Sequence, residues 1–211
     1  MVLHETIRRI RKDKGISQQQ IAQGYLSQSN YSKFEKGTIE ISSSALIGIL
    51  SNLNMELEEL LYIDNNYEYS EKEKIYREFF RTPVKKKEEL GDFLLKCERF
   101  LAKYTDQSIT FIKNLCAILY ESLEKNDIYV NENIARHLLD EFKKKENLYI
   151  KDIYLINSVF FLFPIETAHL TMSYIEKALK KYGDYQSINR MEVNLRLNYS
   201  LMLIKNRAEN E

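Results

Sequence analysis

The stretch Ile16–Gly37, which reads ISQQQIAQGYLSQSNYSKFEKG, constrains the fold more than any other part of this chain. Ser17 stands three residues before Gln20, the S-x-x-Q pattern of a capping box, and Ser27 offers a second N-cap ten residues later. Gly24 suits the left-handed residue that ends a helix, and the stretch closes on another glycine. It therefore predicts two short helices joined by a tight turn.

The second of these helices has one apolar and one polar face. Tyr31 and Phe34 are spaced to point to the same side of the helix. The opposite side carries side chains that donate or accept hydrogen bonds, namely Gln28, Ser29, Ser32, Lys33 and Lys36. Such groups pair with base edges and phosphates of DNA, although any surface helix can carry a polar face that merely meets solvent. We expect a helix-turn-helix, which places its second helix in the major groove.

The charges are unevenly distributed along the chain. The 31 basic and 31 acidic residues cancel overall, so the net charge gives no sign of nucleic-acid binding. Residues 1–37, however, hold seven basic and three acidic side chains, whereas residues 38–61 add only acidic ones. The basic surface must therefore lie on one side of this region if it is to meet DNA phosphates.

The composition favours helices nearly everywhere, because only two prolines and six glycines interrupt many Leu, Ile, Lys and Glu residues. We predict an all-α protein with a five-helix domain over residues 1–63, a polar linker over residues 64–70 and a helical domain over residues 71–211. Helices of the second domain are expected over residues 71–81, 85–104, 108–125, 131–145, 150–163, 165–182 and 187–207. Antiparallel helices in succession, without a strict tetratricopeptide consensus, indicate a degenerate helical-hairpin solenoid or an irregular bundle.

Motifs for catalysis and metal binding are missing from the sequence. Cys97 and Cys116, the two cysteines, form no C-x-x-C pair and are not near a histidine. No Gly-rich phosphate loop or G-x-S-x-G elbow occurs. We therefore predict no catalytic residue, metal or cofactor, and a protein that is not an enzyme. Without a signal peptide, and with its longest uncharged run at residues 153–165, too short to cross a bilayer of roughly 30 Å, the chain is expected to be cytoplasmic.

The N-terminal region resembles the DNA-binding domain of the phage-repressor class, also called the XRE class. The pattern of that class, S-Q, L-A, S and I-S-x-x-E-x-G at matching spacing, is followed by Ser17-Gln18, Ile21-Ala22, Ser27 and Tyr31–Gly37. The resemblance implies that three side chains read base edges, namely Gln28, Ser29 and Lys33. It also implies that three hold phosphates, namely Gln18, Asn30 and Lys36.

Nearly the whole chain resembles the Rgg family, also called MutR or GadR-like. The resemblance rests on a head containing KFEKGTIEISSSALIGILSNLNMELEELL and a helical tail containing LINSVFFLFPIETAHLTMSYIEKALKKY. It implies a cytosolic transcriptional regulator, usually dimeric, whose tetratricopeptide-like C-terminal domain in many members binds a short hydrophobic signalling peptide in quorum sensing. Family members commonly continue for several more helices, whereas this chain stops at Glu211.

Peptide recognition in a helical groove uses side-chain amides for the ligand backbone and apolar pockets for its side chains. Asn194 and Asn198 lie four residues apart on one helix face, and Asn157 leads into an apolar run that includes Phe161. We expect these four residues to form the peptide site, the alternative being that the asparagines cap helices or face solvent.

The last helix, over residues 187–207, spreads apolar side chains over more than one face, so another surface should cover it, and we expect a second copy of the chain there.

The main hypothesis is a dimeric, sequence-specific DNA-binding regulator that senses a short peptide. A second hypothesis keeps DNA binding but loses peptide sensing through the early end of the chain. A third is a helical-repeat adaptor, or an enzyme, that uses its helix-turn-helix only for protein contact.

Overall fold

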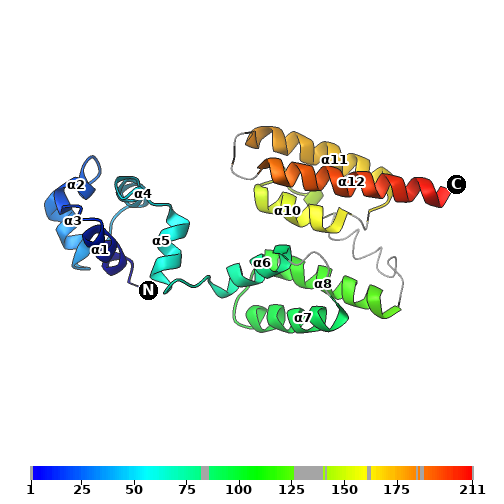
Figure 1. Cartoon of the computed structure of the whole chain (residues 1–211), viewed down its shortest axis with the longest axis horizontal. Coiled ribbons are helices and arrows are strands. Elements are labelled where there is room, and N and C mark those ends of the chain that lie inside the picture. Colours follow the sequence, from blue (N-terminus) through cyan, green and yellow to red (C-terminus); the bar gives the residue numbers. More distant parts are fainter. Residues whose placement is uncertain are drawn as a thin grey trace. The chain divides into compact units, whose positions relative to one another are not determined.

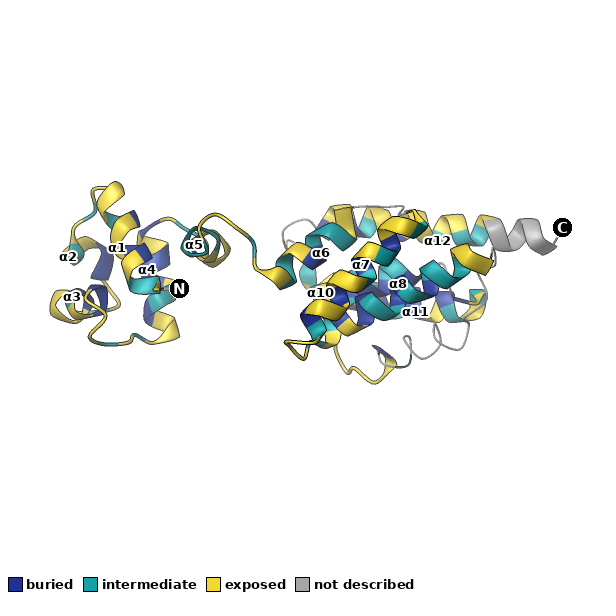
Figure 2. Ribbon diagram, turned by 90° about the horizontal axis from the view of Figure 1, so that it is seen from below, coloured by how far each residue is buried: buried dark blue, intermediate teal, exposed yellow. Residues whose placement is uncertain are grey.

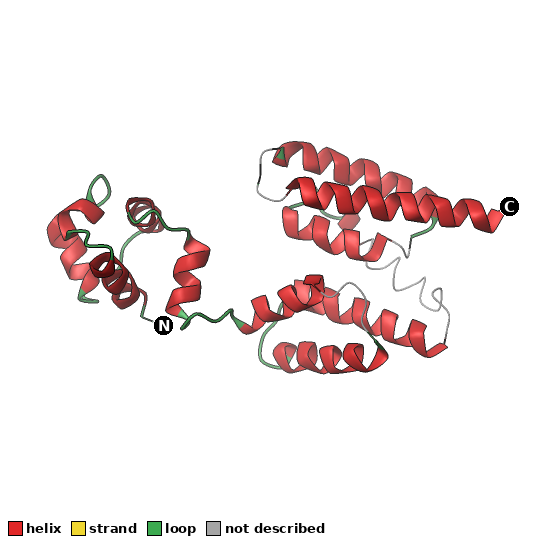
Figure 3. Ribbon diagram, viewed as in Figure 1, coloured by secondary structure: helices red, strands yellow, loops and turns green. Residues whose placement is uncertain are grey.

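The computed structural model describes residues 2–81, 86–125, 140, 142–160, 163–183, 185 and 188–210. Across these residues every regular element is a helix and no strand occurs (Figure 3), which confirms the all-α prediction. Most of the helix predicted over residues 131–145 lies outside the described residues. The chain divides into two compact units, Met1–Lys74 and Ile75–Glu211 (Figure 1), and each is described by itself.

The first unit consists of five helices around one core. They are α1 (Leu3–Asp13), α2 (Gln18–Ala22), α3 (Gln28–Glu35), α4 (Ser43–Asn52) and α5 (Leu57–Asp64). Each helix contributes at least one fully buried apolar side chain, and the five are Ile7, Ile21, Tyr31, Ile49 and Leu60. These five residues belong to one cluster of buried apolar residues, so the unit has a single core (buried residues are dark blue in Figure 2).

Local signals in the sequence begin and end these helices as predicted. The hydroxyl of Ser17 accepts a hydrogen bond from the Gln20 amide at 3.2 Å, and the Gln20 side chain accepts one from the Ser17 amide at 2.9 Å. Ser27 caps α3 by accepting from the Asn30 amide at 3.2 Å. Gly24 has a φ of 84°, the left-handed conformation that the turn between α2 and α3 requires.

The second unit contains the remaining helices. They are α6 (Glu71–Arg81, which begins before the boundary between the units), α7 (Lys87–Leu101), α8 (Gln107–Lys125), α10 (Ile150–Val159), α11 (Ile165–Leu179), the 3-10 helix η2 (Lys180–Tyr182) and α12 (Ile188–Asn210). α7 packs along α8, and α11 along α12 (Figure 1). Cys97 of α7 and Cys116 of α8 have no exposed surface and lie in the same core.

Several helices in this unit differ in their bounds from the prediction, one of them being the last, which is Ile188–Asn210 instead of residues 187–207. The helix predicted over residues 150–163 ends at Val159, and Pro164 serves as the N-cap of α11. A residue before proline disfavours the helical conformation, which applies here to Phe163. The helix predicted over residues 165–182 changes to a 3-10 turn after Leu179, a common way for a helix to end. The helix predicted over residues 85–104 is shorter, Lys87–Leu101.

Between the last helix of the first unit and α6, residues 65–70 carry no regular element. Asn66 and Tyr67 adopt left-handed conformations there, with φ of 54° and 61°. The ring of Tyr62 packs against the rings of Tyr67 and Tyr69, with centroids 6.0 and 4.7 Å apart. This non-helical segment lies within the linker predicted over residues 64–70.

Candidate nucleic-acid and peptide interfaces

Helix α3 separates its core side chains from its polar ones. Tyr31 and Phe34 are buried, with ring centroids 6.0 Å apart. The three side chains predicted to read bases, Gln28, Ser29 and Lys33, are all exposed, and none forms a hydrogen bond or ion pair within the described part of the chain. Their donors and acceptors are therefore available to a ligand such as a DNA base edge.

Glu35, the last residue of α3, connects three helices. Its carboxylate is 3 % exposed and accepts two hydrogen bonds from Arg11 of α1, from Nε at 2.5 Å and from Nη2 at 3.0 Å. It also accepts one from Nε2 of Gln18 in α2 at 2.8 Å. Arg11 Nη1 in turn donates to the carbonyl of Ile16 at 2.7 Å. These contacts fix how α3 is oriented against α1 and α2.

The same contacts keep Glu35 ionised. Burial alone would raise the pKa of its carboxyl, but the hydrogen bonds from Arg11 and Gln18 and the charge of Arg11 outweigh it and lower that pKa below its ordinary value. The pKa of the Arg11 guanidinium is raised, chiefly by its hydrogen bond to Glu35. Burial, followed by the nearby Glu35 carboxylate, raises the pKa of the Tyr31 hydroxyl. The site is therefore a charged pair at neutral pH.

The three side chains predicted to hold phosphates are not equally free. Asn30 and Lys36 are exposed, and their side chains have no partner among the described residues. Gln18, in contrast, uses its amide nitrogen for Glu35, which leaves its amide oxygen and its second amide hydrogen. The sequence pattern did not reveal this internal role, although Glu35 falls four residues after Tyr31 on the buried side of α3, where a charged side chain requires a partner.

The lysines and arginines of residues 1–37 divide into two groups. Arg11 is bound to Glu35, and Lys14 Nζ donates to the carbonyl of Leu53 at 2.7 Å. The others are exposed and unpaired within the described residues, namely Arg8, Arg9 and Lys12 on α1 and the two lysines of the α3 region. Only this second group is free to attract DNA phosphates.

The turn before α3 is packed against α4. The ring of Tyr25 lies so close to Gly48 that a Cβ atom at residue 48 would be 2.2 Å from the ring. Nδ2 of Asn52, also on α4, donates to the carbonyls of Ile21 and Gln23 at 3.0 Å each. α4 therefore supports the turn that sets where α3 begins.

Two of the residues predicted to bind a peptide meet across helices. Nδ2 of Asn198, on α12, donates to Oδ1 of Asn157, on α10, at 3.1 Å. The pair leaves one amide donor group on Asn157 and one carbonyl acceptor on Asn198, which match the hydrogen-bonding groups of a peptide backbone. Asn194 is exposed one turn earlier on α12. Phe161 lies outside the described residues.

An apolar stripe runs along the solvent side of α12. It consists of Val193, Leu197, Leu201 and Ile204, whose exposed fractions are 64, 55, 55 and 65 %. Met191 and Leu195 of the same helix are buried. The helix thus carries apolar side chains on two faces, as its sequence indicated, and the outer face is unusual for a surface helix in water.

Metal ligands and membrane-spanning helices are not found in the part of the chain that the structure describes. No group of three or more His, Cys, Asp or Glu side chains is arranged to hold a metal ion among those residues. No helix there is both long enough and apolar enough to cross a membrane.

Comparison with protein families and solved structures shows which known proteins this chain resembles. A helix-turn-helix family model matches residues 7–60, and no curated protein gives a significant sequence match. A protein from Listeria monocytogenes EGD-e described as a transcriptional regulator aligns with a TM-score of 0.75 and 21 % identity over 99 % of this chain and 72 % of its own.

Two further structures are similar over most of their length. PlcR of Bacillus thuringiensis, solved with the peptide PapR7 and DNA, aligns with a TM-score of 0.60 and 19 % identity over 99 % of this chain and 75 % of its own. Rgg2 of Streptococcus dysgalactiae, an SHP pheromone receptor, aligns with a TM-score of 0.56 and 20 % identity over 95 % of this chain and 77 % of its own. The chain therefore carries a helix-turn-helix domain at residues 7–60 and has, over nearly its whole length, the fold of the Rgg and PlcR transcriptional regulators.

Proposed function

We propose that this helix-turn-helix regulator reads a specific DNA sequence through α3 and that a short peptide bound to its second unit controls that activity. The observation that carries the first part is the free polar face of α3 on a helix whose orientation is fixed through Glu35. A rigidly held helix presents its side chains in one geometry, which base discrimination requires.

On this proposal each exposed side chain of α3 has a role. Gln28 pairs with adenine, Lys33 with guanine, and Ser29 with either partner of a base pair. Asn30 and Lys36 hold phosphates, and Gln18 adds one through the part of its amide that Glu35 does not use. The unpaired basic side chains of α1 increase the attraction to the DNA backbone without adding sequence information.

The regulator acts as a homodimer. The apolar stripe on α12 is a single seam with spacings of four, four and three residues, which is the pattern of a helix that pairs with another helix. A twofold axis would place the same stripe of a second copy against it in antiparallel order. Two copies then present two α3 helices to half-sites about 34 Å apart, one turn of DNA.

The peptide site lies around Asn157, Asn194 and Asn198. The donor and acceptor left free by the Asn157–Asn198 pair are complementary to one residue of an extended peptide backbone. The fold shared with PlcR, which was solved with a peptide and DNA together, supports this assignment.

The DNA-binding part is tested by selecting an operator from a random DNA library and measuring binding by fluorescence anisotropy at several salt concentrations. Lys33→Ala combined with Gln28→Ala should weaken operator binding at least tenfold, because each base contact contributes about 1–3 kcal/mol. Lys177→Ala, which removes an exposed lysine of α11, is the matched control. Specific binding that survives the double substitution would show that the assignment of α3 is wrong.

The peptide-sensing part is tested by calorimetry with a library of short apolar peptides. Binding at micromolar concentration that Asn198→Ala weakens supports the proposal. An absence of binding while DNA affinity persists would favour the alternative of a regulator that has lost peptide sensing. A protein whose DNA affinity is absent, or does not depend on salt, would instead fit a helical-repeat adaptor.

A further inference from the structure

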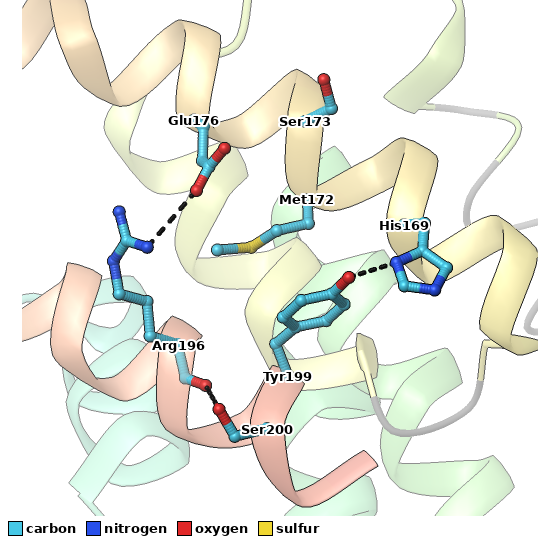
Figure 4. A pocket seen from close by; sticks show the side chains of 7 residues that line it. All are labelled: His169, Met172, Ser173, Glu176, Arg196, Tyr199 and Ser200. Carbon is cyan, nitrogen blue, oxygen red and sulfur yellow. Dashed lines mark hydrogen bonds and ion pairs between the residues drawn. The ribbon is translucent and has the colours of Figure 1, made fainter. Parts of the chain in front are cut away.

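A surface pocket of about 360 Å³ lies between α11 and α12. Four of its lining residues come from α11 and three from α12: His169, Met172, Ser173 and Glu176, and Arg196, Tyr199 and Ser200 (Figure 4). Asn194 and Asn198 do not line the pocket. Around α12 each lies about 160° from Arg196, because each is two residues away from it in the sequence. The pocket is thus separate from the peptide site proposed above.

The pocket has a polar group at each end and an apolar middle. At one end Arg196 Nη1 lies 3.5 Å from Glu176 Oε1, and at the other the hydroxyl of Tyr199 is hydrogen-bonded to His169 Nδ1. The side chain of Met172 lies between these two pairs (Figure 4). A thioether and an aromatic ring therefore form the middle of the pocket, and both accept aliphatic groups readily.

The charges at the Glu176 end favour a cation. Arg196 is bound chiefly to Glu192 of its own helix, through Nη2 at 2.7 Å and Nε at 3.0 Å to the same oxygen. The distance from Arg196 Nη1 to Glu176 Oε1, 3.5 Å, is longer than the two distances to Glu192, so the Glu176 carboxylate keeps lone pairs for another donor. Two carboxylates against one guanidinium leave one negative charge, which attracts cations and repels phosphates and carboxylates.

We propose that this pocket binds an aliphatic ammonium group. The ammonium head donates hydrogen bonds to Glu176, and the methylene stem lies along Met172 and the ring of Tyr199. Glu176 and His169 are seven residues apart on α11, about 10 Å along the axis, which gives room for a stem of several methylene groups. Such a group occurs both in free amines and in lysine side chains.

The test uses the full chain labelled with ¹³C in its methionine methyl groups, because Met172 reports directly on the middle of the pocket. The probes are n-pentylammonium, its uncharged counterpart 1-pentanol, and Nα-acetyl-lysine methylamide. We expect saturable shifts of the Met172 methyl signal with both cations and at least fivefold weaker binding of pentanol. Equal affinity for the two cations would show that an alkylammonium group alone accounts for binding. Tighter binding of the lysine derivative would identify a lysine side chain as the ligand.

Variants separate the proposed contact from general electrostatics. Glu176→Gln should weaken pentylammonium binding at least fivefold, whereas Glu166→Gln, an exposed acid of the same helix outside the pocket, should leave it unchanged. Arg196→Gln should strengthen binding at least twofold by removing the competing cation. Equal binding of pentanol, or unchanged affinity in Glu176→Gln, would overturn the proposal. Since the readout is direct binding, neither result depends on whether the protein binds DNA or a peptide.

Discussion

Arg11 of α1 donates hydrogen bonds from two nitrogens to the carboxylate of Glu35, the last residue of α3, and so connects the two helices. Arg11→Met should therefore destabilise the protein by about 3 kcal/mol, since it leaves a buried carboxylate without its main partner. Urea unfolding followed by circular dichroism measures this. Glu68→Gln breaks the exposed pair with Lys74 and should leave the unfolding midpoint unchanged. Equal effects of the two substitutions would contradict the role given to Glu35.

The lowered pKa of Glu35 makes the packing of α3 sensitive to acid. A carboxyl whose pKa is lower in the folded state stabilises that state fully above its unfolded pKa, which is near 4.5, and the stabilisation is lost as pH falls through the folded value. The protection of the α3 amides against hydrogen exchange, measured relative to their intrinsic exchange rate at each pH, should therefore decrease below about pH 4.5. In Glu35→Gln this particular dependence should disappear, and its persistence would assign the acid sensitivity to other groups.

Gly48 and Tyr25 should be energetically coupled. Gly48→Ala alone should destabilise the first unit, because the new methyl group meets the Tyr25 ring. In a Tyr25→Ala background the same change should be stabilising by about 1 kcal/mol, since alanine is the better helix former. A double-mutant cycle of unfolding free energies measures the coupling, and additive effects would show that the ring moves aside without cost.

Substitutions of Ser27 and Ser29, two residues apart, should affect different properties, the first the stability of the protein and the second its affinity for the operator. Ser27→Ala removes the N-cap of α3 and should cost about 1 kcal/mol of stability. Ser29→Ala removes an exposed hydroxyl without an internal partner, so it should reduce operator affinity and leave stability unchanged. Thermal unfolding and anisotropy on the same two variants test both statements.

The apolar stripe of α12 should control self-association. If the proposed dimer forms through this stripe, Leu197→Lys with Leu201→Lys should give a monomer in sedimentation experiments. Operator binding should also weaken, because each copy then contributes one half-site contact at a time. Leu170→Lys is the control, since Leu170 is 73 % exposed but lies on α11 outside the stripe. A dimer that survives the double substitution would place the interface elsewhere.

Signals that act over a few residues were readable in the sequence. Ser17 and Ser27 cap the helices they precede, and Gly24 takes its left-handed conformation, because each acts on backbone groups within about four residues. Periodicity likewise placed Tyr31 and Phe34 in the core. These features depend on local geometry alone.

Contacts between distant residues were not readable in the same way. Arg11 and Glu35 are 24 residues apart, and Asn157 and Asn198 are 41 apart. Periodicity gives the face on which each side chain lies but not which face of another helix meets it. For that reason Arg11 was counted among the charges for DNA, and the pocket at Glu176 and Tyr199 was not predicted.

The two cysteines have a practical consequence for studying this protein. Cys97 and Cys116 are the complete set of thiols in the sequence, and both lie wholly inside the second core. Buried thiols react slowly with maleimides and other alkylating reagents. A single cysteine introduced on the surface of α3 can therefore carry a spin label or fluorophore with little labelling of the native thiols. In the proposed dimer, the distance between the two α3 helices then becomes directly measurable in solution.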